Sequence, residues 1–318
     1  MKKLAKSQGF SAIIGVVVML IAFSVVDFHG WWTVNTIASV LQFASIIGFL
    51  AMGEALVIMT GEIDLSVGSV YGLAGVAFVT LGGTLGVPGA VLAALLIAGA
   101  VGLLQGLAVV RGGIPSMIVT LGGLFTARGI IYVWTGGTVR AFPEEARAYW
   151  LTRLLGGNFL GLDAPFFWML IVLGLLSLVM LKMRFGNRLL ATGGNLASAQ
   201  SRGVRTGRIK VATFTLSALL AGFSAIVTLS NDPQTHVTLG ELMELEAISA
   251  AVIGGCLLSG GRGSLLGAVL GALIVVSFRY ELIALGAPSA WYQTFVGIVL
   301  IIAVIANQNL ARWAVQKT

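Results

Sequence analysis

The chain has 318 residues, of which 58% are hydrophobic and only 10% are charged, and its mean hydropathy is +1.00. A soluble domain carries about 25% charged residues and could not cover this much apolar surface, so a water-soluble fold is excluded and repeated membrane crossing is predicted. The formal charge of +7 does not indicate nucleic-acid binding, because the Lys and Arg residues lie in short loops beside apolar segments.

Ten apolar segments are candidates for membrane-spanning helices, each of which needs about 20 residues. They cover residues 10–28, 35–59, 67–85, 88–110, 115–136, 164–181, 211–230, 246–260, 263–280 and 290–307. The first resembles a signal peptide, but no small-residue cleavage site follows it, so we interpret it as a retained span. The eighth is short, and a tilted, broken or re-entrant course stays open, as does a total of eight spans. The predicted fold is an all-α polytopic helix bundle, one domain over residues 1–318.

Composition supports close helix packing and argues against a metal site. The 43 glycines are roughly twice the usual share, and small residues let helices approach closely in lipid. The single cysteine, Cys256, lies in an apolar run, so a disulfide framework is excluded. Neither His29 nor His236 has a neighbour at ligand spacing. We therefore predict no metal and no cofactor.

The loop over residues 182–210 predicts the orientation. It carries seven Lys or Arg residues and no acid, and positive loops stay in the cytoplasm. With this loop inside, ten spans place both termini in the cytoplasm. Fourteen of the 19 Lys and Arg residues then lie inside, and nine of the 12 acids lie outside. This asymmetry supports the ten-span arrangement.

Two further loops are predicted on the outer side. Residues 138–163 form the longest, and Pro143 with a mixture of charges indicates that it is partly structured. The second, residues 231–246, contains Glu241, Glu244 and Glu246. Either it is a solvated helix start, where Glu suits the N-terminal dipole, or it is a surface for an extracytoplasmic partner.

Glu54 and Arg128 are the clear ionisable residues within the predicted spans. A charge there costs about 2.5–3.5 kcal/mol on insertion scales, so it faces protein or a water-filled cavity. The two side chains could pair across spans two and five as a structural clasp. Alternatively, either could line a transport path and hydrogen-bond a polar solute, or Arg128 could extend to the outer interface.

The most distinctive short stretch is TGEIDLSVGS, residues 60–69. Asp64 or Ser66 could accept hydrogen bonds from the free N–H groups at the start of the third span. The same residues could also lie beside a transport path, since irregular backbone at membrane depth must face protein or water. The transport-path candidates are therefore Glu54, Asp64, Ser66 and Arg128.

Motifs for catalysis are missing. The chain has no G-x-x-x-x-G-K-[ST] phosphate loop, no H-E-x-x-H and no G-x-S-x-G, which argues against an enzyme. The few ionisable residues in the spans argue against coupling to an ion gradient. Within the 182–210 loop, GGNLASA at residues 193–199 predicts a short capped helix, a candidate docking surface.

Six blocks of the sequence are distinctive: TGEIDLSVGSVYGLAG at 60–75, IPSMIVTLG at 114–122, TARG at 126–129, ATGGN at 191–195, SAQSRGV at 198–204 and AAVIGGCLLSGGRGSLLG at 250–267. In these blocks the chain resembles the permease subunits of bacterial sugar-type ABC importers, the ribose, xylose and autoinducer-2 group. The likeness covers nearly the whole chain, and the blocks together are more specific than any one of them alone. The sequence departs from the pattern at Glu54, Glu62 and Cys256, which leaves the class intact but puts the solute in doubt.

The resemblance implies a multi-pass permease of the bacterial plasma membrane, or inner membrane in a Gram-negative cell. Its implied partners are cytoplasmic ATP-binding subunits, a periplasmic or lipid-tethered solute-binding protein, and a second permease, identical or paralogous. The segment from 194 to 203 corresponds to the region that couples to the ATPase. The ATPase-coupling residues it implies are Gly194, Asn195, Ser198, Ala199, Arg202 and Gly203.

The function predicted is ATP-driven import of a small polar solute, a monosaccharide or related sugar or polyol, by alternating access. The alternatives are a stand-alone facilitator or secondary carrier, and a membrane-embedded enzyme or scaffold. Uptake by the chain alone would favour the facilitator. Pentoses, hexoses, deoxy-sugars, polyols and furanosyl signal molecules all remain open as solutes.

Overall fold

Helices account for most of the computed structural model, which describes residues 10–288, 291–302 and 305. Four two-residue strands join them: β1 (Arg140–Ala141), β2 (Asn158–Phe159), β3 (Leu162–Asp163) and β4 (Gln234–Thr235). The helices are α1 (Phe10–Val26), α2 (Phe28–Trp31), α3 (Val34–Met59), α4 (Val67–Gly112), α5 (Ser116–Thr135), α6 (Glu144–Arg147), α7 (Trp150–Gly156), α8 (Ala164–Lys182), α9 (Arg184–Gly194), α10 (Leu196–Ser201), α11 (Thr206–Asn231), α12 (Met243–Ile253) and α13 (Leu265–Ala284).

Six of the described helices are long and apolar enough to cross a membrane: α3, α4, α5, α8, α11 and α13. They coincide closely with spans predicted from the sequence, and they confirm a predominantly helical membrane protein. Helix α1 and the apolar helix over 291–302 are shorter. The terminal Lys and Arg residues that support the predicted orientation, and part of the span expected at 290–307, lie outside the described residues. The count of ten spans and the side of each terminus therefore stay predictions.

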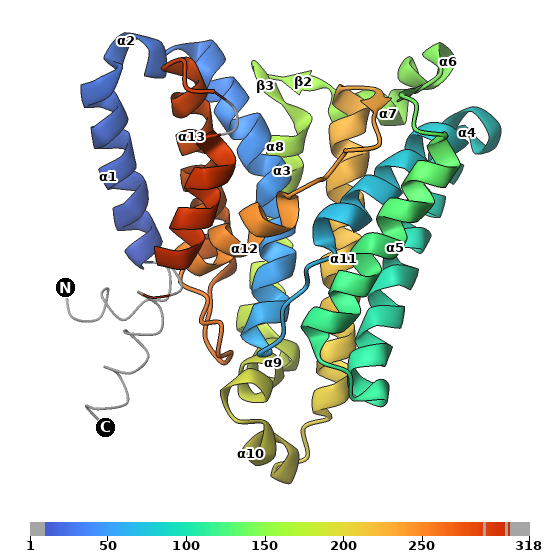
Figure 1. Ribbon diagram of the computed structural model, residues 1–318, viewed down its shortest axis with the longest axis vertical. Coiled ribbons are helices and arrows are strands. Elements are labelled where there is room, and N and C mark those ends of the chain that lie inside the picture. The colour runs from blue at the N-terminus through green and yellow to red at the C-terminus, as the bar shows by residue number, and fades with distance from the viewer. Residues whose placement is uncertain (1–9, 289–290, 303–304, 306–318) are drawn as a thin grey trace.

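Helix α4 reverses direction within its 46 residues (Figure 1). Gly86 has φ +66° and ψ 169°, a non-helical conformation that a residue with a Cβ adopts only at a cost. Pro88 follows, at the start of the second half, where its missing N–H needs no helical partner. The two halves, 67–85 and 87–112, correspond to the separate spans predicted at 67–85 and 88–110.

Helix α12 is too short to cross the membrane. Its 11 residues rise about 16 Å, roughly half of the ~30 Å hydrocarbon core. The chain reaches its start through irregular backbone and leaves its end at Gly254 through a turn. A continuous span over 246–260 is therefore wrong, and the broken course that the sequence left open is the one observed.

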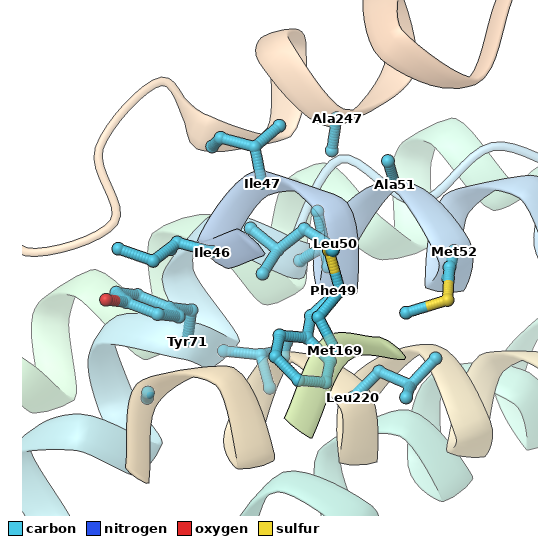
Figure 2. Close-up of a cluster of buried hydrophobic side chains, with 14 of the residues drawn as sticks. Ile46, Ile47, Phe49, Leu50, Ala51, Met52, Tyr71, Met169, Leu220 and Ala247 are labelled. Carbon is cyan, nitrogen blue, oxygen red and sulfur yellow. The ribbon is translucent and has the colours of Figure 1, made fainter. Parts of the chain in front are cut away.

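The centre of the bundle is α3. In its most apolar window, 83% of the residues are buried, against 17% for the peripheral α8. Figure 2 shows Phe49, Leu50 and Met52 of α3 among side chains from four other helices. Those neighbours are Tyr71 of α4, Met169 of α8, Leu220 of α11 and Ala247 of α12. A displacement of α3 must therefore disturb every helix that packs on it.

The bundle has two distinct ends (Figure 1). At one, which we call the sheet end, β1 pairs antiparallel with β4 and β2 pairs antiparallel with β3. Helices α6 and α7 lie at the same end, so residues 138–163 are partly structured, as predicted. At the other, which we call the α10 end, α9 and α10 extend beyond the long helices. The polypeptide thus presents a different surface at each end.

Helices α12 and α13 pack through glycines. A Cβ at Gly271 would overlap the carbonyl group of Ala250, and one at Gly267 would overlap the carbonyl oxygen of Gly254. Residues four apart lie on one helix face, so these two glycines give α13 a smooth side against α12. This packing explains part of the high glycine content.

Replacing Gly271 by valine should destabilise the protein. The added side chain must separate α12 from α13, and overpacking of this kind costs about 1–3 kcal/mol. We expect the midpoint of thermal unfolding in detergent to fall by several degrees. The matched control is Gly174→Val on α8, where a Cβ meets no atom within 4 Å. Equal midpoints for the two variants would contradict the packing argument.

Candidate functional site

Two irregular segments enter the interior of the bundle. Residues 60–66 connect α3 to α4, and residues 236–242 connect β4 to α12 (Figure 1). Irregular backbone at this depth occurs in membrane proteins only where it is buried in protein or lines water. Helices broken in this way form the solute and ion sites of many transporters.

The starts of α4 and α12 lie against one another. A Cβ at Gly68 would overlap both the carbonyl oxygen of Gly240 and a carboxylate oxygen of Glu244. Gly240 itself has φ +78° and lies against the Gly68 carbonyl group. We call the region formed by residues 64–69 and 239–244 the junction. Two glycines make this close approach possible, because neither presents a side chain to the other backbone.

Helix N-termini carry free N–H groups and partial positive charge, and the junction brings two of them together. Ser66, the N-cap of α4, makes no capping bond with its side chain. The carboxylate of Glu244, in the first turn of α12, lies beside the first turn of α4. Negative charge is favourable at both helix starts. Glu244 is therefore positioned to stabilise the junction electrostatically.

Asp64, Ser66 and Gln105 form a buried hydrogen-bonded group. Asp64 Oδ1 accepts from the backbone N–H of Ser66 at 2.9 Å and from its hydroxyl at 2.6 Å. The amide of Gln105, on α4, donates to Ser66 Oγ at 2.8 Å. The predicted cap is wrong in detail, because Asp64 stabilises the turn before α4 and does not bond the free N–H groups of its first turn. The group fixes the start of α4 against its own second half.

Arg128 bonds to the backbone of the junction. Its guanidinium donates to the Leu239 carbonyl at 2.7 Å and lies 3.5 Å from the Val237 carbonyl. Glu241 and Glu244 are close enough to interact with it electrostatically. The predicted Glu54–Arg128 clasp is wrong, and the side chain points into the protein rather than to the outer interface. Arg128 holds an irregular segment whose carbonyl groups would otherwise lack donors.

Glu54 lies in the C-terminal part of α3, five residues before the end of the helix, and is completely buried. Neither of its carboxyl oxygens has a hydrogen-bond partner of normal geometry in the described part of the chain. Asp64 and Glu244 lie within electrostatic range of it. A buried intramembrane acid that takes part in no ion pair with a described residue is a functional candidate, because its desolvation is costly. The structure thus brings Glu54, Asp64, Ser66 and Arg128 into one region around the junction.

The segment 231–246 is not a solvated helix start. Glu244 and Glu246 are 7% and 5% exposed, because α12 begins inside the bundle. Glu246 forms an ion pair with Arg279, with 3.5 Å between the carboxylate oxygen Oε1 and the guanidinium nitrogen. The Arg279 guanidinium also lies 4.9 Å from the centre of the Tyr292 ring. Glu241, Glu244 and Glu246 were all recognised in the sequence, but the burial of Glu244 and Glu246 was not, and only Glu241 of the three is exposed.

The short helix predicted at the loop is present as α10, which projects from the α10 end (Figure 1). Asn195 caps it by accepting from the N–H of Ser198 at 2.9 Å. Gly194, Arg202 and Gly203 are exposed, Ser198 is half-buried and Ala199 is buried. The six predicted coupling residues therefore lie together, mostly at the surface.

Sequence reasoning missed three contributors to these sites. Gln105 was detectable as a lone amide within an apolar span. Glu244 was visible as an acid but was placed in solvent. The ion pair between Glu62 and Lys210 joins residues 148 positions apart, so no local pattern could indicate it. Among the described residues, no group of three or more His, Cys, Asp or Glu residues could hold a metal ion.

Comparison with known proteins gives a consistent result. The family model described as branched-chain amino acid transport system / permease component matches residues 36–304. The autoinducer 2 import system permease protein LsrC of Escherichia coli (strain K12 / DH10B) is 32% identical over 320 residues, which cover 100% of this chain and 91% of the relative. LsrC of Photorhabdus luminescens is also 32% identical, with 100% and 94% covered. LsrC of Salmonella typhi is 31% identical, with 100% and 90% covered.

Replacing Arg128 by glutamine should loosen the junction. The variant loses the charge-assisted bond to the Leu239 carbonyl, worth about 1.5–3 kcal/mol, and the weaker contact with the Val237 carbonyl. We expect amide hydrogen exchange in residues 236–242 to accelerate at least about tenfold, by the conversion of 1.4 kcal/mol to one decade. Arg153→Gln, an exposed change at the sheet end, serves as the control. Unchanged exchange in the Arg128 variant would refute the clamp.

Proposed function

The chain belongs to the permease family of ABC importers, as a sugar-type member, and we propose that a separate ATPase drives its import of a small polar solute. Members of this family are inner-membrane transport components rather than enzymes. The proposed solute is a monosaccharide or a related sugar or polyol. The proposed cycle is alternating access, in which the pathway opens first to one side of the membrane and then to the other.

The observation that carries the proposal is the form of the α9–α10 loop. A short capped helix with exposed residues projects beyond the bundle on the segment with seven Lys or Arg residues (Figure 1). Such a helix is suited to insert into a groove of a cytoplasmic partner, because its side chains are free to contact another surface. We propose that Gly194, Asn195, Ser198, Ala199, Arg202 and Gly203 form the ATPase-docking surface.

Permeases of this class work with ATP-binding and solute-binding subunits. For this chain we propose two cytoplasmic ATP-binding subunits, a second permease and a periplasmic or lipid-tethered binding protein. The exposed face of α5 supports the second permease. Gly122 and Gly129 meet no atom that a Cβ would touch, so another helix could approach there closely. The binding protein would deliver its solute at the sheet end.

The junction is the proposed gate of the pathway. Its backbone is irregular, its polar groups are buried, and α4 and α12 both start there. Small relative movements of two helix starts would expose N–H groups, the Glu54 carboxyl and the Asp64 side chain to a solute. These groups can hydrogen-bond hydroxyls, which is the recognition that a sugar or polyol needs. The transport-path residues are therefore Glu54, Asp64, Ser66 and Arg128.

Changing the charge on the docking surface should uncouple the importer. In Arg202→Glu or Gly203→Glu, the added acid disturbs contact with the ATPase, and at Gly203 the φ of +78° adds backbone strain. We expect solute uptake per ATP hydrolysed to fall at least about tenfold while the subunits still assemble. Arg184→Glu, exposed on α9, is the matched charge control. Normal coupling in both variants would remove the docking role.

Reconstitution should distinguish the two proposed functions, an ATP-driven importer and a stand-alone facilitator. We expect the purified chain in proteoliposomes to show neither ATP hydrolysis nor net uptake, and uptake to require the ATPase and the binding protein together. The panel of radiolabelled solutes should include pentoses, hexoses, deoxy-sugars, polyols and autoinducer 2, the last because the relatives are named for its import. Uptake by the chain alone would support the facilitator instead.

A further inference from the structure

We propose that the Glu62–Lys210 ion pair transmits movement of the α9–α10 loop to the junction, which makes both side chains positioning residues for coupled transport. The inference deepens the proposed function and rests on it, because it concerns how ATPase docking reaches the solute path. It assigns a role to two residues that neither line the junction nor belong to the docking surface.

The ion pair joins two separate parts of the chain. We call residues 184–205, which contain α9 and α10, the docking loop. Lys210 lies just after it, near the start of α11, and its ammonium group contacts Glu62 Oε1. Glu62 lies in the irregular segment between α3 and α4. The Lys210 and Glu62 side chains are only 18% and 14% exposed. A shielded pair is screened less by salt than a surface pair, so it can bind the two segments together.

A second contact connects the same two regions. A Cβ at Gly193, near the end of α9, would overlap the carbonyl oxygen of Met59 at the end of α3. The N–H of Gly261 donates to that same oxygen at 2.9 Å, so the turn after α12 also takes part. Three segments thus meet with no side chain between them. The docking loop cannot shift far toward the bundle without moving the end of α3.

From Glu62, the connection to the junction is short. Asp64 follows two residues later and accepts both hydrogen bonds from Ser66, the N-cap of α4. Ile63 donates its N–H to Ser116 Oγ at 3.4 Å, which links the segment to α5. Segment 60–66 therefore contacts the start of α11 through Glu62 and the start of α4 through Asp64. Only one residue separates Glu62 from Asp64, so a displacement of Glu62 should also displace the start of α4.

The pair also differs from the other ion pair in the described part of the chain. Glu246 and Arg279 join α12 to α13, and both lie far along the chain from α9 and α10. In that part of the chain, only Glu62 and Lys210 connect by an ion pair the start of α11, which follows α10, with the segment that leads into the junction. The position of the pair, rather than its strength alone, indicates a role in transmission.

The test measures solute imported per ATP hydrolysed in the reconstituted complex with the ATPase and binding protein. The variants are Glu62→Gln, Lys210→Met and the charge-reversed double change Glu62→Lys with Lys210→Glu. Coupling perturbations along a transmission route are typically two- to thirty-fold, so we expect a loss of about that size in each single variant. The reversed pair should recover at least about half of the wild-type ratio. Lys182→Met, exposed just before the docking loop, is the matched control and should retain it.

A second measurement uses the unaltered complex, so it does not depend on the folding of a variant. A non-hydrolysable ATP analogue should change amide exchange in residues 60–66 together with exchange in α10. Full coupling in both single variants, no recovery in an assembled reversed pair, or unchanged exchange in 60–66 would each overturn the inference. Failure of the wild-type complex to assemble or to import would instead refute the proposed function, because the inference concerns only transmission within a working importer.

Discussion

Irregular backbone inside a membrane must find hydrogen-bond partners within the protein, and the junction depends on this constraint. The Leu239 carbonyl accepts a hydrogen bond from the Arg128 guanidinium. In the turn before α4, Asp64 accepts a hydrogen bond from the backbone N–H of Ser66. These bonds let the chain interrupt two helices at membrane depth. The interruptions in turn create an irregular, polar region inside an otherwise apolar bundle, the kind of region in which many transporters bind their solutes.

The same constraint explains where glycine is needed. Gly68 and Gly240 let one backbone lie directly on another at the junction. At the α10 end, Gly193 allows a comparable contact with the Met59 carbonyl. Contacts between backbones are short and stiff, since no flexible side chain separates them. A shift of one such segment must therefore move its neighbour.

Local chemistry predicted much of this structure. Hydrophobic length located the six long helices, and the Asn195 cap with its small following residues indicated α10. Local chemistry failed where the outcome depended on distant residues. Glu54 and Arg128 were the obvious pair by charge, but Arg128 bonds to the 237–239 backbone instead. Glu244 and Glu246 have the composition of a solvated helix start and are buried, because the segment before them turns into the bundle.

By itself, the sequence determined the class of protein and its helical membrane fold, and it indicated the candidate docking loop and the four candidate residues that lie around the junction. Those properties follow from apolar length, charge distribution and motifs, which are readable along the chain. Only the tertiary structure decided that α4 and α12 meet at their starts, that Arg128 clamps the junction, and that Glu62 reaches Lys210. The contacts of the first two cases join residues between 109 and 176 positions apart, and that of the third joins residues 148 positions apart. Their partners are chosen by how helices pack around α3, and packing is not encoded in any short stretch.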